Sequence, residues 1–213
     1  GVKIHLKTRL EADAVKALNP DVVIVATGST PQRTGFTEAL PLRTEMPGVE
    51  QENVLTVWEI LEGKAEVNGK NVLVIDNDAA HEAYATADYI ADGEGKVQIV
   101  SRLYHTGMDL APVHDIILYY RRLLEKGVTF IPTHLVKEIK GNKAMIYNVY
   151  APTQERTLEN IDLFVLAMGK NPNDALYKEL KGKVPELYRI GDCVAPRKTH
   201  YAIWDGHMTG RKI

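Results

Sequence analysis

The chain has 213 residues, of which 45% are hydrophobic, and its formal net charge at pH 7 is −2. These values are ordinary for a globular protein and leave room for one large domain or two small ones. The small charge gives no electrostatic reason to expect nucleic acid or an anionic membrane as a partner. No apolar run approaches the roughly 20 residues of a membrane span.

Cysteine and histidine usage excludes several kinds of site. The single cysteine, Cys193, excludes an internal disulfide and a cysteine-ligated cluster within the chain. The histidines are scattered, without HExxH or CxxC, so no metal site is predicted. A GxSxG elbow and a Walker-type GxxxxGK sequence are also missing, which disfavours hydrolases and kinases. The first residues lack a signal-peptide layout, and a cytoplasmic protein is expected.

The first third of the chain predicts short elements and long loops. Residues 2–6 suit a short strand and residues 11–18 a short helix or turn. Residues 21–28 form a buried strand that runs into a tight turn at Gly28, and Pro, Gly and Thr then indicate a loop. A loop-rich connector is expected between residues 35 and 69, with a short helix at 57–61.

The middle of the chain follows a βαβ pattern. Strands are expected at 71–75, 96–101 and 128–131, with helices at 79–91 and 112–126, the second capped by Gly127. Residues 135–139 and 144–150 then alternate like antiparallel strands around Gly141 and Asn142. These elements predict a parallel sheet interrupted by an antiparallel β-meander.

The turn after residues 71–75 lacks the glycines of a dinucleotide-binding turn. Glycines let the backbone approach a pyrophosphate at the helix N-terminus, whereas Asp76 and Asp78 stand here. The next strand ends in Ser101 and Arg102, without the acidic residue that binds the ribose of NAD. Arg102 alone suits the 2′-phosphate of NADP. Because two carboxylates repel a phosphate, we expect NAD(P) to bind weakly at most.

The last third repeats an earlier pattern. Residues 161–169, like 21–28, contain an aspartate, an apolar strand and a small-residue turn ending in Gly. A strand at 187–192 ends in Gly191 and Asp192, and a helix follows at 200–211. The echo predicts two similar nucleotide folds. Residues 1–68 and 161–213 would form one domain, with residues 69–160 inserted as the second.

The order of these segments resembles flavoproteins that have two dinucleotide-binding domains. It is most similar to the C-terminal region of the trimethylamine dehydrogenase and 2,4-dienoyl-CoA reductase family. The resemblance rests on Val23-Ile-Val-Ala-Thr-Gly-Ser-Thr-Pro31, Asn71-Val-Leu-Val-Ile-Asp76, Tyr188-Arg-Ile-Gly-Asp-Cys-Val-Ala-Pro-Arg197 and Ala202-Ile-Trp-Asp-Gly-His207. It implies an α/β, Rossmann-like fold in which residues 1–68 and 161–213 bind FAD or ADP and residues 69–160 resemble an NAD(P)-binding domain.

The resemblance also implies what lies outside the chain. Family members carry upstream a barrel that binds FMN, a cysteine cluster that binds a 4Fe–4S centre, and a first GxGxxG unit. The chain would therefore be an inactive fragment of an oxidoreductase that acts on amines or enoyl thioesters. It would contain half of the FAD or ADP site and no catalytic residue. Expected partners are the rest of the polypeptide, an electron-transfer protein and, in the full enzyme, a second copy.

Gly191 and Asp192 are the strongest candidates for nucleotide binding. They end a strand at the carboxyl edge of a sheet, where open α/β folds bind ligands. The Asp192 carboxylate can accept a ribose or ribityl hydroxyl, although Gly-Asp after a strand also serves as a simple turn with an Asx cap. Thr27 and Gly28 end the strand predicted at residues 21–28. They either lie where a nucleotide crosses the sheet edge or form a tight turn.

The resemblance adds three further cofactor-binding candidates: Ser29, Ile203 and Trp204. Trp204 either packs over a cofactor or fills an interface between domains. Cys193 is interpreted as a small buried thiol without a redox partner.

Two other functions stay open. The chain can be a scaffold that keeps the fold for subunit contacts and binds no nucleotide. It can also belong to an NAD(P)H-using reductase, which the missing turn glycines disfavour. The missing glycines fit better with family members that resemble amine dehydrogenases, which pass electrons to a protein acceptor.

Overall fold

The computed structural model describes residues 1–213, which divide into two compact units. Unit 1 comprises residues 1–30 and 170–213, and unit 2 comprises residues 31–169. The chain passes between the units twice, at β2 (Ser29–Pro31) and β11 (Lys170–Pro172), and these two short strands pair with each other. No helix is long and apolar enough to cross a membrane.

Unit 1 is built on two parallel strands, β1 (Val22–Val25) and β12 (Glu186–Arg189). A small apolar core joins these strands to α1 (Ala12–Ala17) and α5 (Ala175–Leu180) through residues such as Val15, Val25 and Leu180. After β12, the 3-10 turn η2 (Gly191–Cys193) leads to α6 (Thr199–Gly210), which has no buried residue.

Unit 2 contains a five-stranded parallel sheet in the order β3-β10-β4-β5-β6. The strands are β3 (Val54–Thr56), β10 (Leu163–Ala167), β4 (Asn71–Asp76), β5 (Lys96–Ser101) and β6 (Thr129–Ile131). β4 lies at the centre and is almost wholly buried, which explains its uninterrupted apolar sequence.

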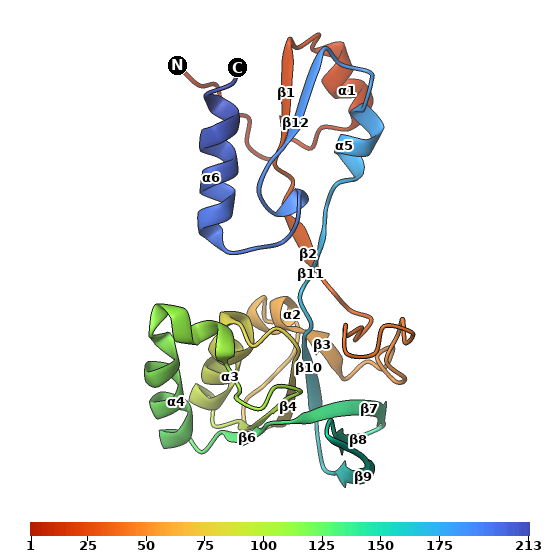
Figure 1. Cartoon of the computed structure of the whole chain (residues 1–213), viewed down its shortest axis with the longest axis vertical. Helices are drawn as coiled ribbons and strands as arrows, with labels where there is room; N and C mark the ends of the chain where they lie inside the picture. Colours follow the sequence, from red (N-terminus) through yellow and green to blue (C-terminus); the bar gives the residue numbers. More distant parts are fainter. The chain divides into compact units, whose positions relative to one another are not determined.

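The two faces of this sheet are covered differently, as Figure 1 shows. Val72 and Val74 of β4 pack with the helices, which are α2 (Val57–Leu61), α3 (His81–Asp92), the 3-10 helix η1 (Met108–Val113) and α4 (Asp115–Glu125). Leu73 and Ile75 face the other way because side chains alternate along a strand. There they pack with the β-meander, formed by β7 (His134–Lys140), β8 (Lys143–Asn148) and β9 (Ala151–Leu158).

Most of the predicted elements are confirmed. The α/β fold, the parallel sheet and the antiparallel meander are present, and Gly127 follows α4 with a φ of 76°. The strand predicted at 2–6 is wrong, because these residues pair with no strand and their apolar side chains are exposed. The helix predicted from residue 112 begins at Asp115, after a 3-10 segment that contains Pro112.

The compact units divide at different residues from those expected. The predicted boundaries lay at 68/69 and 160/161, whereas the units divide at 30/31 and 169/170. The reason is that β3 and β10 pair with each other, and β10 also pairs with β4, so both belong to the sheet of unit 2. The segment 161–169, which echoes 21–28 in sequence, therefore lies in the other unit.

Candidate nucleotide sites

The β4–α3 turn, residues 76–80, occupies the place of a dinucleotide-binding turn at the carboxyl end of the central strand. Asp76 ends β4 and is buried. One carboxylate oxygen, Oδ1, accepts the Ala79 backbone N–H at 2.8 Å, and Oδ2 accepts the Tyr84 hydroxyl at 2.9 Å. Burial raises the pKa of Asp76 from 3.8 to about 6, although these hydrogen bonds favour the ionised form. Asp76 thus supports the turn from beneath and is not available to a ligand.

Asn77 fixes the outer side of this turn through its side-chain amide. Its Oδ1 accepts hydrogen bonds from the Thr37 hydroxyl at 2.6 Å and from Nε of Arg102 at 3.3 Å. Its Nδ2 donates to Glu38 at 2.9 Å and, more weakly, to Asp78 at 3.4 Å. The loop that follows β2 therefore reaches across the carboxyl edge of the sheet and is hydrogen-bonded there.

Arg102 is paired with a residue of this loop. Its guanidinium forms an ion pair with Glu38, and the side chain of Arg102 is only 25% exposed. The hydrogen bonds from Asn77 and Arg102 lower the pKa of Glu38 against the opposing effect of burial. Arg102 was the residue expected to suit the 2′-phosphate of NADP, and here it is paired with the carboxylate of Glu38.

Asp78 lies against Gly169, at the end of the neighbouring strand β10. Gly169 follows β10 with a φ of 84°, and a Cβ there would lie 2.9 Å from Oδ2 of Asp78. Ser101, at the end of β5, is buried and its hydroxyl hydrogen-bonds to Asp76. The four residues predicted from the degenerate turn, Asp76, Asp78, Ser101 and Arg102, are therefore brought together at one sheet edge.

These contacts decide how well a dinucleotide phosphate fits the turn. The turn and the loop bring three carboxylates to this sheet edge, those of Glu38, Asp76 and Asp78, and the Arg102 guanidinium is already paired with Glu38. The N-cap of α3 is Ala80, which provides no side-chain hydrogen bond, and Glu82 adds an acid to the first helical turn. A phosphate would need a positive helix end and free N–H donors. The residues present do not fit NAD(P).

The second candidate site lies in unit 1, where β12 ends. The Ser29 hydroxyl donates to Oδ2 of Asp192 at 3.1 Å, and the Arg197 backbone N–H donates to Oδ1 at 3.3 Å. Gly191 has a φ of 66°, and its N–H donates to Asp205 of α6 at 3.1 Å. A Cβ at Gly191 would lie 3.4 Å from that of Ala202, so glycine permits a close approach of α6 to the turn.

Thr27 and Gly28 follow β1 at the same end of the pair of strands. The Thr27 hydroxyl donates to the Asn173 backbone oxygen, and the Asn173 N–H donates to the Gly28 oxygen at 2.9 Å. Gly28 has a φ of 72°, and no atom lies within 4 Å of a Cβ built there. These residues form the tight turn that the sequence predicted, with open space beside Gly28.

The remaining candidates differ in exposure. Cys193 is fully buried, and its Sγ lies 3.1 Å from the backbone oxygens of Val25 and Ile190, as expected for a buried thiol. Ile203 and Trp204 on α6 are 68% and 61% exposed. Both side chains are therefore open to a ligand or a covering segment. No three His, Cys, Asp or Glu side chains are grouped as metal ligands.

Sequence reasoning missed Thr37, Glu38 and Asn77. Their partners lie 25 to 64 residues away along the chain. No local pattern shows that a loop reaches a sheet edge at such a distance. The only signal was the polar composition of the turn itself, which identified Asp76 and Asp78 but not the loop.

Comparison with known proteins adds three findings, while no family model matches the chain. The chain is 32% identical, over 96% of its length, to N,N-dimethylglycine/sarcosine dehydrogenase of Chromohalobacter salexigens. Among solved structures, it matches 6-hydroxypseudooxynicotine amine oxidase of Pseudomonas geniculata N1 with a TM-score of 0.91, 26% identity and 98% of the chain covered. It matches 2-naphthoyl-CoA reductase with a TM-score of 0.84, 30% identity and 100% of the chain covered.

The chain accounts for only part of each of these proteins. It spans 33% of the dehydrogenase, 31% of the amine oxidase chain and 30% of the naphthoyl-CoA reductase chain. The match includes the strand, turn and helix segments that carried the sequence resemblance. Over nearly its whole length the chain is similar to flavoproteins of the trimethylamine dehydrogenase and 2,4-dienoyl-CoA reductase family, which confirms the predicted resemblance to the C-terminal region of that family.

Proposed function

We propose that this chain is the FAD- or ADP-binding and docking part of a longer flavin-dependent oxidoreductase that acts on amines or enoyl thioesters. The proposal is supported by similarity to N,N-dimethylglycine/sarcosine dehydrogenase, to an amine oxidase and to 2-naphthoyl-CoA reductase. Similarity of about 30% covers nearly the whole chain, but the chain spans only a third of each relative. The activity therefore belongs to the longer polypeptide.

The observation that carries the proposal is the arrangement around Asp192. Its carboxylate lies at the carboxyl end of β12, beside the end of β1, and is held in place by Ser29 and the Arg197 N–H. A carboxylate fixed at this edge accepts a ribose or ribityl hydroxyl, and Gly191 lets the backbone approach closely. We propose Thr27, Gly28, Ser29, Gly191, Asp192, Ile203 and Trp204 as the half of the nucleotide site that this chain contains.

The chemistry itself would come from groups outside the chain. In the proposed enzyme, FMN and a 4Fe–4S centre held by other parts of the polypeptide would supply the redox chemistry. The residues of this chain would orient the nucleotide and exclude water around it. Because Cys193 is buried against two backbone carbonyls, cysteines elsewhere in the polypeptide would hold the cluster.

Unit 2 would serve as a scaffold in the longer enzyme. The filled β4–α3 turn disfavours NAD(P)H as the electron donor or acceptor. A protein that accepts electrons is the better expectation, with further contacts to the rest of the polypeptide and to a second copy.

Replacing Asp192 by Ala in the longer enzyme tests the proposal. A hydrogen bond to a charged group contributes roughly 1.5–3 kcal/mol, so affinity for ADP should fall by about one to two orders of magnitude. The measurements are the ADP dissociation constant and the melting temperature of the same variant. Asp13, which pairs with Lys16 on the surface of unit 1, provides the control Asp13→Ala.

One observation favours a scaffold without any nucleotide. Both Asp192 oxygens and the Thr27 hydroxyl already have partners within the chain. If Asp192 is only a turn cap, Asp192→Ala will lower the melting temperature and leave ADP affinity unchanged. That result would assign the residue to the scaffold and remove the nucleotide from the proposal.

A further inference from the structure

An open groove lies between the loop that follows β2 and the outer surface of the β-meander. It has a volume of about 510 Å³ and is lined by Leu40, Arg43, Pro47, Lys137, Tyr147, Pro152 and Glu155. Every one of these residues belongs to unit 2. This volume falls within the range of roughly 300–1,000 Å³ that is typical of small-molecule sites.

Arg43 is the charged residue without an ionic partner in this groove. Its Nη1 donates to the Val136 and Lys137 backbone oxygens, both at 3.0 Å, which ties the loop to β7. Its Nε is buried without a hydrogen-bond partner, and none of the ion pairs includes Arg43. Burial lowers the pKa of its guanidinium, and the nearby Tyr147 opposes this shift. An anion stabilises a partly buried cation of this kind.

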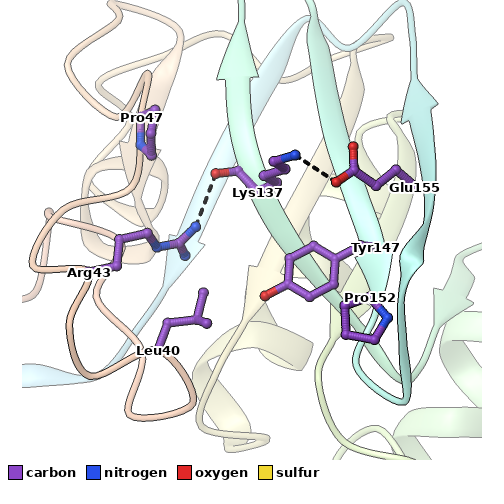
Figure 2. A pocket seen from close by; sticks show the side chains of 7 residues that line it. All are labelled: Leu40, Arg43, Pro47, Lys137, Tyr147, Pro152 and Glu155. Atoms are coloured by element: carbon purple, nitrogen blue, oxygen red, sulfur yellow. Dashed lines mark hydrogen bonds and ion pairs between the residues drawn. The ribbon is translucent and has the colours of Figure 1, made fainter.

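The other two charges of the groove neutralise each other. Lys137 and Glu155 pair at 2.6 Å across β7 and β9. Figure 2 shows this pair on one side, with the Arg43 guanidinium and the Tyr147 ring facing the space between the loop and the meander. Leu40, Pro47, Tyr147 and Pro152 give that space apolar walls, of which the Tyr147 ring is flat.

We propose that this groove binds a small carboxylic acid with a flat apolar body. The carboxylate pairs with Arg43, through the Nη2 that donates to no protein acceptor, and the body packs against Tyr147 and the two prolines. Arginine suits this role because its planar guanidinium matches a carboxylate. The proposal does not depend on the nucleotide site, because the groove residues belong to unit 2 whereas Asp192 belongs to unit 1.

Calorimetric titration of the full chain with phenylacetate and with its neutral isostere phenylacetamide tests the charge. We expect saturable binding of phenylacetate with a dissociation constant of about 1 mM or tighter, and binding of the amide about tenfold weaker. Arg43→Gln should remove the advantage of the acid. Arg121→Gln, which removes a surface cation paired with Glu125 on α4, should preserve it. Equal affinities for acid and amide, or no saturation with either, would overturn the proposal.

A second pair of variants keeps the test decisive if Arg43→Gln disturbs the loop. Leu40→Glu places a carboxylate in the groove, where it should pair with Arg43 and compete with phenylacetate. Leu40→Gln has nearly the same size without the charge and should retain the preference for the acid over the amide. If both variants bind phenylacetate alike, Arg43 does not recognise the carboxylate and the proposal fails.

Discussion

Among single residues, Asp76 is a buried carboxyl group with a strongly shifted pKa. It is buried beneath α3, and its two oxygens are occupied by the Ala79 N–H and the Tyr84 hydroxyl. Burial raises its pKa from 3.8 to about 6, so the folded chain holds this proton more tightly than the unfolded chain. The contribution of Asp76 to stability is therefore fully present below about pH 4 and is lost as the pH rises through about 6.

Replacing Asp76 by Asn should remove this pH dependence. A pKa raised by about two units corresponds to about 3 kcal/mol, which the wild type loses between about pH 4 and 6. Urea unfolding of both proteins at pH 4, 5, 6 and 7 measures the difference. As the pH rises, the free energy of unfolding of the variant should increase relative to that of the wild type. Parallel stability profiles for the two proteins would show that Asp76 does not titrate in this range.

At the scale of elements, the loop that follows β2 is pinned to the meander by close backbone contact. The Ile139 N–H donates to the Pro47 oxygen at 2.9 Å, and Gln51 bonds to the Gly48 and Ile139 oxygens. Gly48 has a φ of 90°, and a Cβ there would lie 2.0 Å from the Ile139 oxygen. Glycine is therefore required at this position both for its conformation and for its small size.

We expect Gly48→Ala to destabilise unit 2 by more than about 3 kcal/mol, because the backbone of β7 cannot move away without breaking the meander. Gly63→Ala is the matched control. Gly63 also has a positive φ, of 73°, but a Cβ there meets no atom within 4 Å, so only about 1–2 kcal/mol of backbone strain is expected. Urea unfolding of the two variants compares them. Similar losses would mean that the contact with Ile139 is unimportant.

The sequence predicted best those elements that are determined by residues close together in the chain. The strands and helices from Asn71 to Ile131 follow from apolar periodicity and were predicted close to their true bounds. β3 and β9 were missed because they are short or polar and form only by pairing with distant strands. α5 carried no distinct signal either. The Asp192 turn was identified from its Gly-Asp ending, whereas the loop contacts of Asn77 required the fold.

For the whole molecule, the difference between the two units is the central feature. Unit 2 has a full sheet with both faces covered, whereas unit 1 has two paired strands and a helix, α6, with no buried residue. Exposed apolar side chains on α6, including Ile203 and Trp204, leave a surface that further polypeptide can cover. The proposed nucleotide half-site lies in unit 1.

This difference predicts that the 213-residue chain purifies without flavin. Cofactor affinity requires groups on both sides of the nucleotide, and unit 1 presents only the edge formed by β1 and β12. The visible absorption spectrum of freshly purified protein is the measurement. A stoichiometric flavin band would mean that unit 1 alone holds the cofactor.

The most direct test concerns the β4–α3 turn, which has the architecture of a dinucleotide site and the wrong charges. Calorimetric titration of the chain with NADPH and NADH is the measurement, repeated on Arg102→Gln. Each uncompensated carboxylate near a phosphate costs on the order of 1 kcal/mol or more, so we expect no dissociation constant in the micromolar range and no effect of the substitution. A micromolar dissociation constant for NADPH that Arg102→Gln abolishes would contradict the assignment of this turn as filled by the chain itself.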